Sequence, residues 1–149
     1  MSTHQQLLYH VVFSTKNRKQ WLTEEFRPKV FAYIAGVCKE LGGYAIIVNG
    51  YVDHVHLLVR IPAKVAVSEF VGKLKSGTSK HINDTSGLIQ KFGWQDGFGA
   101  FTVSVSAKDR VDKYIENQVQ HHQNQSFENE YLGLLEKHEV EYDRKYVFD

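Results

Sequence analysis

Two histidines separated by one residue, His54 and His56, lie inside an otherwise apolar run that extends from Asp53 to Val59. Successive side chains of a β-strand point to opposite faces, so the two imidazoles share one face. Two neutral imidazoles held by one rigid strand are suitable ligands for a metal ion. A strand buried on both faces normally carries Val or Ile at such positions, so the pair indicates either a metal site or a partly solvated sheet face.

A second set of reactive side chains is expected on a helix between about residues 107 and 123. Helical residues advance by about 100° each, so Tyr114, Gln118 and His121 fall within roughly 60° of one another. One helical face thus offers a phenol, an amide and an imidazole. On these residues alone, Tyr114 could equally be an interface aromatic and Gln118 a surface amide.

The elements that precede this helix define an expected fold. Apolar periodicity and β-branched content predict four strands and two helices. The strands are expected at residues 5–14, 44–48, 51–61 and 101–106, and the helices at about 24–41 and 67–82. This order is that of an α+β, ferredoxin-like (RRM-like) βαββαβ antiparallel sheet with both helices on one face.

The histidine strand is predicted to be the second arm of a hairpin. Asn49-Gly50 separates it from the preceding strand, and this dipeptide favours a tight two-residue turn. If the two helices cover the apolar face of the strand, His54 and His56 lie on the opposite, open face. The additional C-terminal helix that carries Tyr114 must then cross to that face to complete a site.

Length and composition limit the classes of protein to consider. The 149 residues have the size of one ordinary domain, and we expect a single domain over residues 1–149. No apolar run approaches the roughly 20 residues of a membrane span and no secretory pattern is present, so a cytoplasmic protein without membrane contact is expected. Cys38 is the only cysteine, which argues against disulfide or thiolate-zinc chemistry.

The charge is unevenly distributed along the chain. The net charge is +1, but seven acidic and three basic residues follow residue 127, which leaves +5 on the rest. A moderately basic body permits binding of a nucleic acid but does not require it.

Four segments of the chain, taken in order, resemble the single-tyrosine transposases of the insertion-sequence 200/605 family, which belong to the histidine-hydrophobic-histidine (HUH) nucleases. A His-x-His pair alone is weak evidence, whereas this ordered set covers nearly the whole chain. The segments are Phe13-Ser14-Thr15-Lys16, Asp53-His54-Val55-His56-Leu57-Leu58, Gly97-Phe98-Gly99-Ala100-Phe101-Thr102-Val103-Ser104, and Tyr114-Ile115-Glu116-Asn117-Gln118 followed by His121-His122.

The resemblance implies a metal-dependent DNA transposase that cleaves and rejoins single-stranded DNA through a 5′-phosphotyrosine intermediate. In this family Tyr114 would attack a DNA phosphate. His54, His56 and Gln118 would bind a divalent metal ion, magnesium or manganese. The family also recognises hairpins at the ends of mobile elements and forms homodimers, in which the tyrosine helix of one subunit can complete the histidine site of the other.

Other residues could take part in such a site. His121 or His122 could compete with Gln118 as the third ligand, and Asp53 is a candidate general base only because it adjoins His54. Single-stranded DNA lying across an open sheet could place its phosphates on basic side chains. The candidates are Lys16, Arg18, Arg60, Lys73 and Lys75.

Three other functions fit the same scaffold. A non-catalytic single-stranded nucleic-acid-binding module would retain DNA affinity after chelation. A metal-dependent hydrolase that uses water would never leave DNA attached to protein, because Tyr114 would only position the substrate. A domesticated relative would process chromosomal repeats with the same chemistry.

Overall fold

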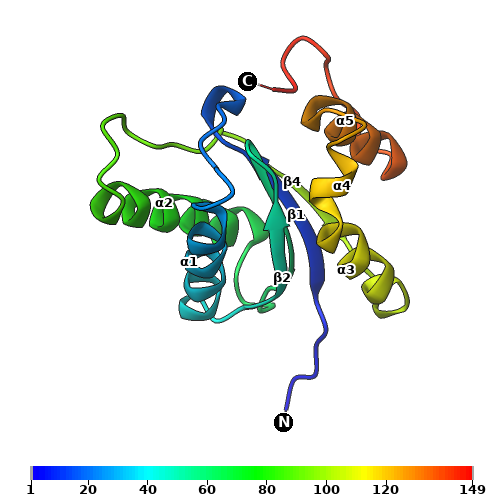
Figure 1. Cartoon of the computed structure of the whole chain (residues 1–149). Coiled ribbons are helices and arrows are strands. Elements are labelled where there is room, and N and C mark those ends of the chain that lie inside the picture. Colours follow the sequence, from blue (N-terminus) through cyan, green and yellow to red (C-terminus); the bar gives the residue numbers. More distant parts are fainter. Residues whose placement is uncertain (1, 149) are drawn as a thin grey trace.

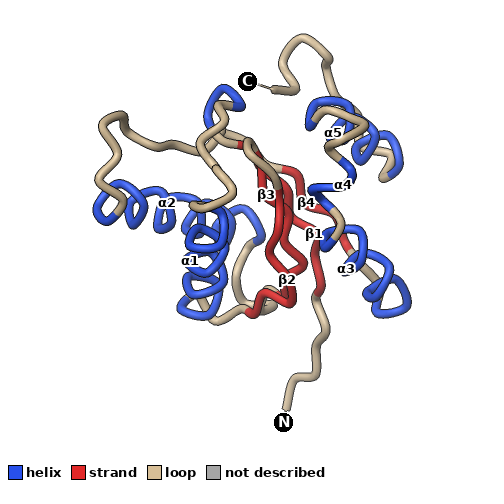
Figure 2. The backbone as a smooth tube through the Cα atoms, in the orientation of Figure 1, coloured by secondary structure: helices blue, strands red, loops and turns tan. Residues whose placement is uncertain are grey.

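A four-stranded antiparallel sheet with helices on both faces forms the protein (Figure 1 and Figure 2). The computed structural model describes residues 2–148. The strands are β1 (Leu8–Ser14), β2 (Tyr44–Gly50), β3 (His54–Arg60) and β4 (Gly99–Thr102), in the spatial order β2-β3-β1-β4. With α1 (Arg27–Glu40) and α2 (Val67–Thr85) as the two crossovers, this is the ferredoxin-like arrangement. The predicted α+β class and element order are confirmed.

The central strands β1 and β3 separate two different environments. Val55, Leu57 and Val59 of β3 are fully buried in one apolar cluster with residues of α1 and α2. The alternate residues His54 and His56 are also fully buried, on the other face. The alternation expected for a strand therefore holds, but neither face is exposed to solvent.

The second face is covered by the C-terminal helices α3 (Lys108–Glu116), α4 (Gln118–His121) and α5 (Phe127–Lys137), which lie across the sheet from α1 and α2 (Figure 1). The expectation of an open sheet face is therefore wrong. The predicted continuous helix is also broken, at Asn117. The amide Nδ2 of Asn49 in β2 lies 3.0 Å from the carbonyl oxygens of Ile115 and Glu116, so it donates to carbonyls at the end of α3.

The hairpin that carries the histidines turns later than predicted. Asn49 and Gly50 belong to β2 and pair with His56 and Val55, and the chain turns at residues 51–53. Position 50 requires glycine because the backbone of His54 comes very close to it: a Cβ there would lie 2.1 Å from the carbonyl oxygen of His54. The displaced turn places Asp53 directly before β3.

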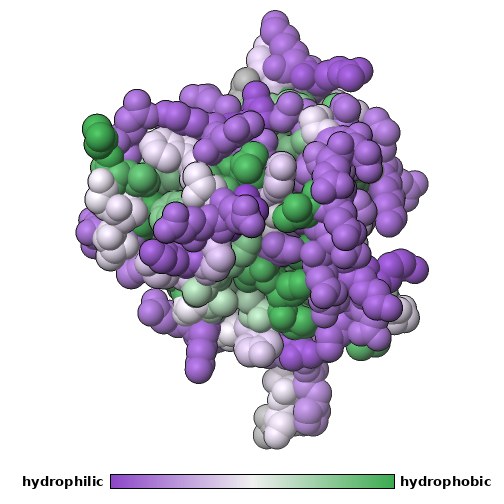
Figure 3. Space-filling model, in the orientation of Figure 1, coloured by the Kyte–Doolittle hydropathy of each residue, from purple (hydrophilic) through white to green (hydrophobic). Residues whose placement is uncertain are grey.

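The surface over the C-terminal helices is polar. Hydrophilic side chains predominate over α3, α4 and α5, whereas apolar side chains gather between the layers (Figure 3).

Strand β4 ends at Thr102, earlier than predicted, because residues 105–107 form a short 3₁₀ turn in which Val105 is exposed. Within residues 2–148, no helix has the length and apolar character needed to cross a membrane.

Candidate metal and tyrosine site

His54 is held by hydrogen bonds at both ring nitrogens. Its Nδ1 lies 2.8 Å from Oδ1 of Asp53, so this nitrogen carries a proton and donates it to the carboxylate. The opposite nitrogen, Nε2, lies 2.9 Å from Oε1 of Gln118 and 3.4 Å from Oε1 of Glu130. Asp53 thus fixes the ring so that Nε2 points at the oxygens of α4 and α5.

His56 is oriented in a similar way by a third histidine. Its Nδ1 lies 2.8 Å from Nε2 of His10 on the neighbouring strand β1, and its Nε2 lies 3.0 Å from Oε1 of Glu130. Strand pairing positions both rings, because Val12 and Ser14 of β1 lie directly opposite His56 and His54. The site is therefore built on the two central strands of the sheet.

Glu130 brings these groups together from α5. It is only 3% exposed, and its Oε1 lies 3.0 Å from Nε2 of both His56 and His122. Its Oε2 accepts hydrogen bonds from the hydroxyl of Tyr114 and, at 2.9 Å, from Nε2 of Gln118. One carboxylate thus contacts the predicted nucleophile and the predicted ligands.

Apolar side chains of α5 hold Glu130 in this position. Phe127, Tyr131 and Leu134 recur at helical spacing and pack in one cluster with Phe101 of β4. The ring of Phe127 also stacks on His54, with centroids 4.5 Å apart. Glu130 lies on the same helical face as these side chains, so docking of α5 buries its carboxylate.

Tyr114 lies beside the histidine pair within a single chain. Helix α3 docks on the sheet through Ile115, which is buried, and this places the half-buried Tyr114 above the polar face. Its ring centroid is 5.9 Å from that of His56 and 6.0 Å from that of His10. Although the helix is broken at Asn117, the phenol of Tyr114 in α3 and the amide of Gln118 in α4 meet at one oxygen of Glu130.

The pKa values in the site are strongly shifted. Burial disfavours the charged ring of His54, but hydrogen bonds to Asp53 and Glu130 outweigh it and raise its pKa to about 9. Burial lowers the pKa of His56 to about 4, although Glu130 opposes the shift. Burial and the negative charge of Glu130 both raise the pKa of the Tyr114 phenol. The metal-free site therefore keeps Tyr114 protonated.

Lone pairs are in excess at the centre of the site. His122 donates from Nδ1 to the carbonyl oxygen of Gln125 at 2.9 Å, so a neutral His122, like a neutral His54, turns its Nε2 lone pair toward the oxygens of Gln118 and Glu130. Only an added proton or a cation makes these contacts favourable. Ligand atoms of His54, His122 and Glu130 lie within 4.8 Å of one another. Imidazoles with a carboxylate and an amide oxygen could hold a divalent metal ion.

Most of the predicted site residues meet in this cluster. Glu130 lies at its centre, although it was not predicted from the sequence. His121 lies instead against the ring of Tyr114, at 4.7 Å between centroids, while His122 reaches the oxygens. A sequence signal for Glu130 existed, because it shares a helical face with Phe127 and Tyr131. A carboxylate on an apolar stripe needs a partner in the folded protein.

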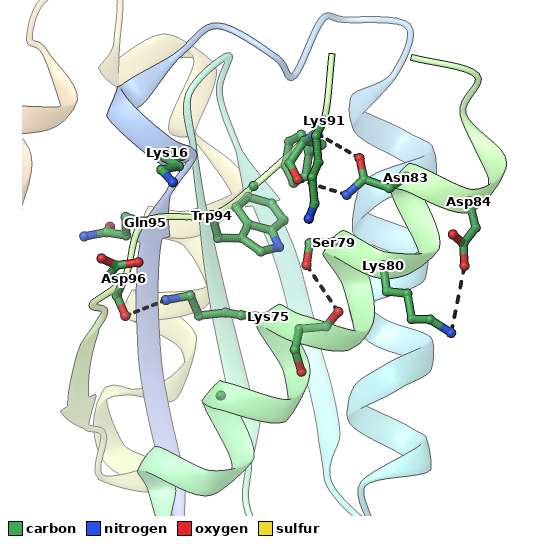
Figure 4. A pocket seen from close by; sticks show the side chains of 14 residues that line it. Lys16, Lys75, Ser79, Lys80, Asn83, Asp84, Lys91, Trp94, Gln95 and Asp96 are labelled. Carbon is green, nitrogen blue, oxygen red and sulfur yellow. Dashed lines mark hydrogen bonds and ion pairs between the residues drawn. The ribbon is translucent and has the colours of Figure 1, made fainter. Parts of the chain in front are cut away.

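The predicted DNA-binding residues lie in several places. Lys75 is only 9% exposed, and its Nζ donates to the carbonyl oxygen of Asp96 at 3.2 Å (Figure 4) and to that of Gly97 at 2.8 Å. With Lys16 it lines a cavity of about 660 Å³ between α2 and the loop before β4. The other three candidates are not among the residues lining this cavity. Arg18 contacts Glu128, Lys73 pairs with Glu69, and Arg60 is exposed at the end of β3.

Comparisons with known proteins agree on one family. The sequence profile of the IS200-like transposases matches residues 3–118. The transposase for insertion sequence element IS200 of Salmonella typhimurium is 28% identical over 117 residues, which are 75% of this chain and 76% of that protein. The ISDra2 transposase TnpA of Deinococcus radiodurans is 27% identical over 118 residues, 76% of this chain and 84% of that protein.

Solved structures share the fold. A Deinococcus radiodurans crystal structure described as a transposase superposes with a TM-score of 0.64 at 24% identity, covering 79% of this chain and 95% of that chain. A REP-associated tyrosine transposase bound to a REP hairpin gives a TM-score of 0.59 at 18% identity, covering 82% and 74%. The family profile includes His54, His56, Tyr114 and Gln118 and ends before Glu130.

Proposed function

Because this chain belongs to the IS200-like transposase family, we propose that it cleaves and rejoins single-stranded DNA through a covalent 5′-phosphotyrosine intermediate. The observation that carries the proposal is the position of the Tyr114 hydroxyl, which shares a carboxylate with His56 inside one chain. The alternative of a non-catalytic binding module leaves this juxtaposition of a phenol and buried imidazoles without a purpose.

Tyr114 is the nucleophile in this proposal. Its oxygen loses its proton and attacks the phosphorus, the bond from phosphorus to the 3′ oxygen breaks, and that oxygen takes up a proton, so the leaving strand departs with a free 3′-hydroxyl. The new phosphotyrosine ester retains the energy of the broken phosphodiester, so another 3′-hydroxyl can attack it and release Tyr114 without a nucleotide cofactor. The same residue thus serves both cleavage and rejoining.

A positive charge is needed near Tyr114. A free tyrosine has a pKa near 10, so forming its phenolate at pH 7 costs about 4 kcal/mol, and burial together with the charge of Glu130 raises that cost in the metal-free site. A divalent metal ion, magnesium or manganese, would supply Lewis-acid charge next to the scissile phosphate. His54, His56 and Gln118 would hold it, and Asp53 and His10 would keep the two imidazoles in the required orientation.

Single-stranded DNA carrying a hairpin is the proposed partner. A structural neighbour is described as bound to a REP hairpin, and the fold shared with that protein supports a similar substrate. Lys16, Arg18, Arg60 and Lys73 remain candidates for phosphate contacts, whereas the carbonyl contacts of Lys75 favour a structural role. We also propose a homodimer, in which each chain contributes its own Tyr114.

A labelling experiment tests the proposal. The protein is mixed with end-labelled single-stranded DNA from the flanks of its own gene and Mn²⁺, and a covalent adduct is sought on a denaturing gel. Tyr114→Phe and His56→Ala should each abolish the adduct. Tyr44→Phe is the matched control, because Tyr44 is 59% exposed. Labelling of the Tyr114→Phe protein would refute the nucleophile, and cleavage without any adduct would indicate a hydrolase that uses water.

A further inference from the structure

The C-terminal segment adds ionisable groups to the site that the family match does not include. The match ends at residue 118, whereas His122 and Glu130 lie beyond it. Both nevertheless reach the centre of the site, where their side chains lie 3.0 Å apart. The candidate site of this chain therefore extends beyond the residues that the family profile matches.

The two oxygens of Glu130 have separate partners. Oε1 faces only imidazole nitrogens, at 3.0 Å from His56 and His122 and 3.4 Å from His54. Oε2 faces only donors, the hydroxyl of Tyr114 and the amide nitrogen of Gln118. A carboxylate can use one oxygen as a metal ligand while the other accepts hydrogen bonds, and this division of partners matches that arrangement.

Burial makes a purely structural role for this carboxylate expensive. Glu130 is 3% exposed, and among the described residues its Oε1 contacts no lysine or arginine. An ionised carboxylate in such a place needs a positive partner. The groups around this oxygen are the imidazole nitrogens of His54, His56 and His122, which are themselves suitable metal ligands, so a metal ion bound among them would supply the positive charge.

We propose that Glu130 is an anionic ligand of the metal ion and also positions the hydroxyl of Tyr114, so that α5 completes the catalytic site. This inference rests on the proposed metal-dependent function. The carboxylate should strengthen the binding of either ion, and the imidazoles should make binding of Mn²⁺ stronger than that of Mg²⁺, because imidazole is a poor ligand for Mg²⁺.

Metal affinity measured without DNA tests the ligand role. The full chain is titrated with Mn²⁺, and free Mn²⁺ is followed by electron paramagnetic resonance. Glu130→Gln keeps the size of the side chain but removes its charge, and it should weaken Mn²⁺ binding about tenfold or more. Glu136→Gln is the matched control on α5, because Glu136 is exposed and its contact with Tyr142 survives the change. It should alter the affinity less than twofold.

A second variant protects the test against misfolding. Glu130→Asp keeps the charge but shortens the reach, and it should weaken binding less than Glu130→Gln does. Circular dichroism verifies that each variant is folded. Unchanged Mn²⁺ affinity in folded Glu130→Gln would overturn the inference. If Glu130→Gln does not fold, Glu130→Asp decides the question. Wild-type Mn²⁺ affinity in Glu130→Asp would then overturn the inference.

The positioning role has a kinetic readout. At saturating Mn²⁺, Glu130→Gln should lower kcat for adduct formation and leave KM for DNA unchanged, because the hydroxyl of Tyr114 loses its anionic acceptor. An unchanged kcat would refute this role. Failure of the proposed function is distinguishable, since a chain that never forms an adduct can still lose Mn²⁺ affinity through Glu130→Gln. If the wild-type protein formed the adduct but Glu130→Gln left Mn²⁺ affinity unchanged, the proposed function would stand and the ligand role of Glu130 would be refuted.

Discussion

The two faces of β3 show what burial alone does not determine. Val55, Leu57 and Val59 on one face and His54 and His56 on the other are all fully buried. The first face contacts apolar side chains of α1 and α2, whereas the second meets a carboxylate, an amide and a phenol from α3, α4 and α5. The same strand thus contributes to the apolar core on one side and to the proposed reactive site on the other.

The two faces of β3 contribute to the free energy of unfolding under different solution conditions. Fully burying a leucine contributes about 1.5–3 kcal/mol, whatever ions are present. Burying Glu130 is favourable only when protons or a metal ion balance its charge. We therefore expect the α1/α2 face to carry the stability of the fold, and the α3–α5 face to respond to pH and to metal.

Leu57→Ala should have the largest effect on stability. It leaves a cavity in the fully buried α1/α2 core, which should cost about 2–5 kcal/mol of unfolding free energy in urea denaturation. The added stability that saturating Mn²⁺ provides should be the same as in the wild-type protein. If Leu57→Ala weakened Mn²⁺ binding as much as Glu130→Gln does, the two faces would not be independent.

The metal-free protein should lose stability as the pH rises from about 6.5 to 9. His54 has a pKa of about 9 in the folded protein and near 6.5 when unfolded, so its bound proton stabilises the fold below 6.5. Losing that contribution should cost roughly 3 kcal/mol, measured by urea denaturation in chelator. His54→Asn should remove this dependence on pH. A wild-type protein equally stable at pH 6.5 and 9 would contradict the pairing of charged His54 with Asp53 and Glu130.

Sequence patterns predicted the α1/α2 face well, because alternation and helical periodicity report apolar burial directly. The predicted position of the hairpin turn was wrong because Asn49 and Gly50 have other roles in the folded chain. Asn49-Gly50 has the composition of a tight turn, but Gly50 is needed where β3 approaches within van der Waals distance, and Asn49 is needed by α3. The first demand arises from strand pairing within the hairpin and the second from a tertiary contact with α3, and the Asn-Gly dipeptide alone specifies neither.

The α3–α5 face was predicted only in part. The spacing of His54, His56, Tyr114 and Gln118 follows from strand and helix geometry, and the structure brings these side chains together. Glu130 escaped prediction because its meeting with them depends on how α5 docks. No periodicity specifies that contact, although a carboxylate on an apolar stripe marks where one must exist.

Matched glycine substitutions should give the smallest effects and compare the two helical layers directly. Gly36 in α1 and Gly133 in α5 are both exposed, and a Cβ at either would meet nothing within 4 Å. Alanine should therefore stabilise each helix by about 0.5–1 kcal/mol.

The two gains should be detected by different measurements. Helix α1 unfolds with the apolar core, so Gly36→Ala should raise the free energy of unfolding and leave Mn²⁺ affinity unchanged. Docking of α5 delivers Glu130, so Gly133→Ala should tighten Mn²⁺ binding by up to about fivefold, because 1.4 kcal/mol corresponds to tenfold. Equal effects of both variants on Mn²⁺ affinity would show that the metal site is not coupled to α5 more than to α1, and the distinction between the two faces would fail.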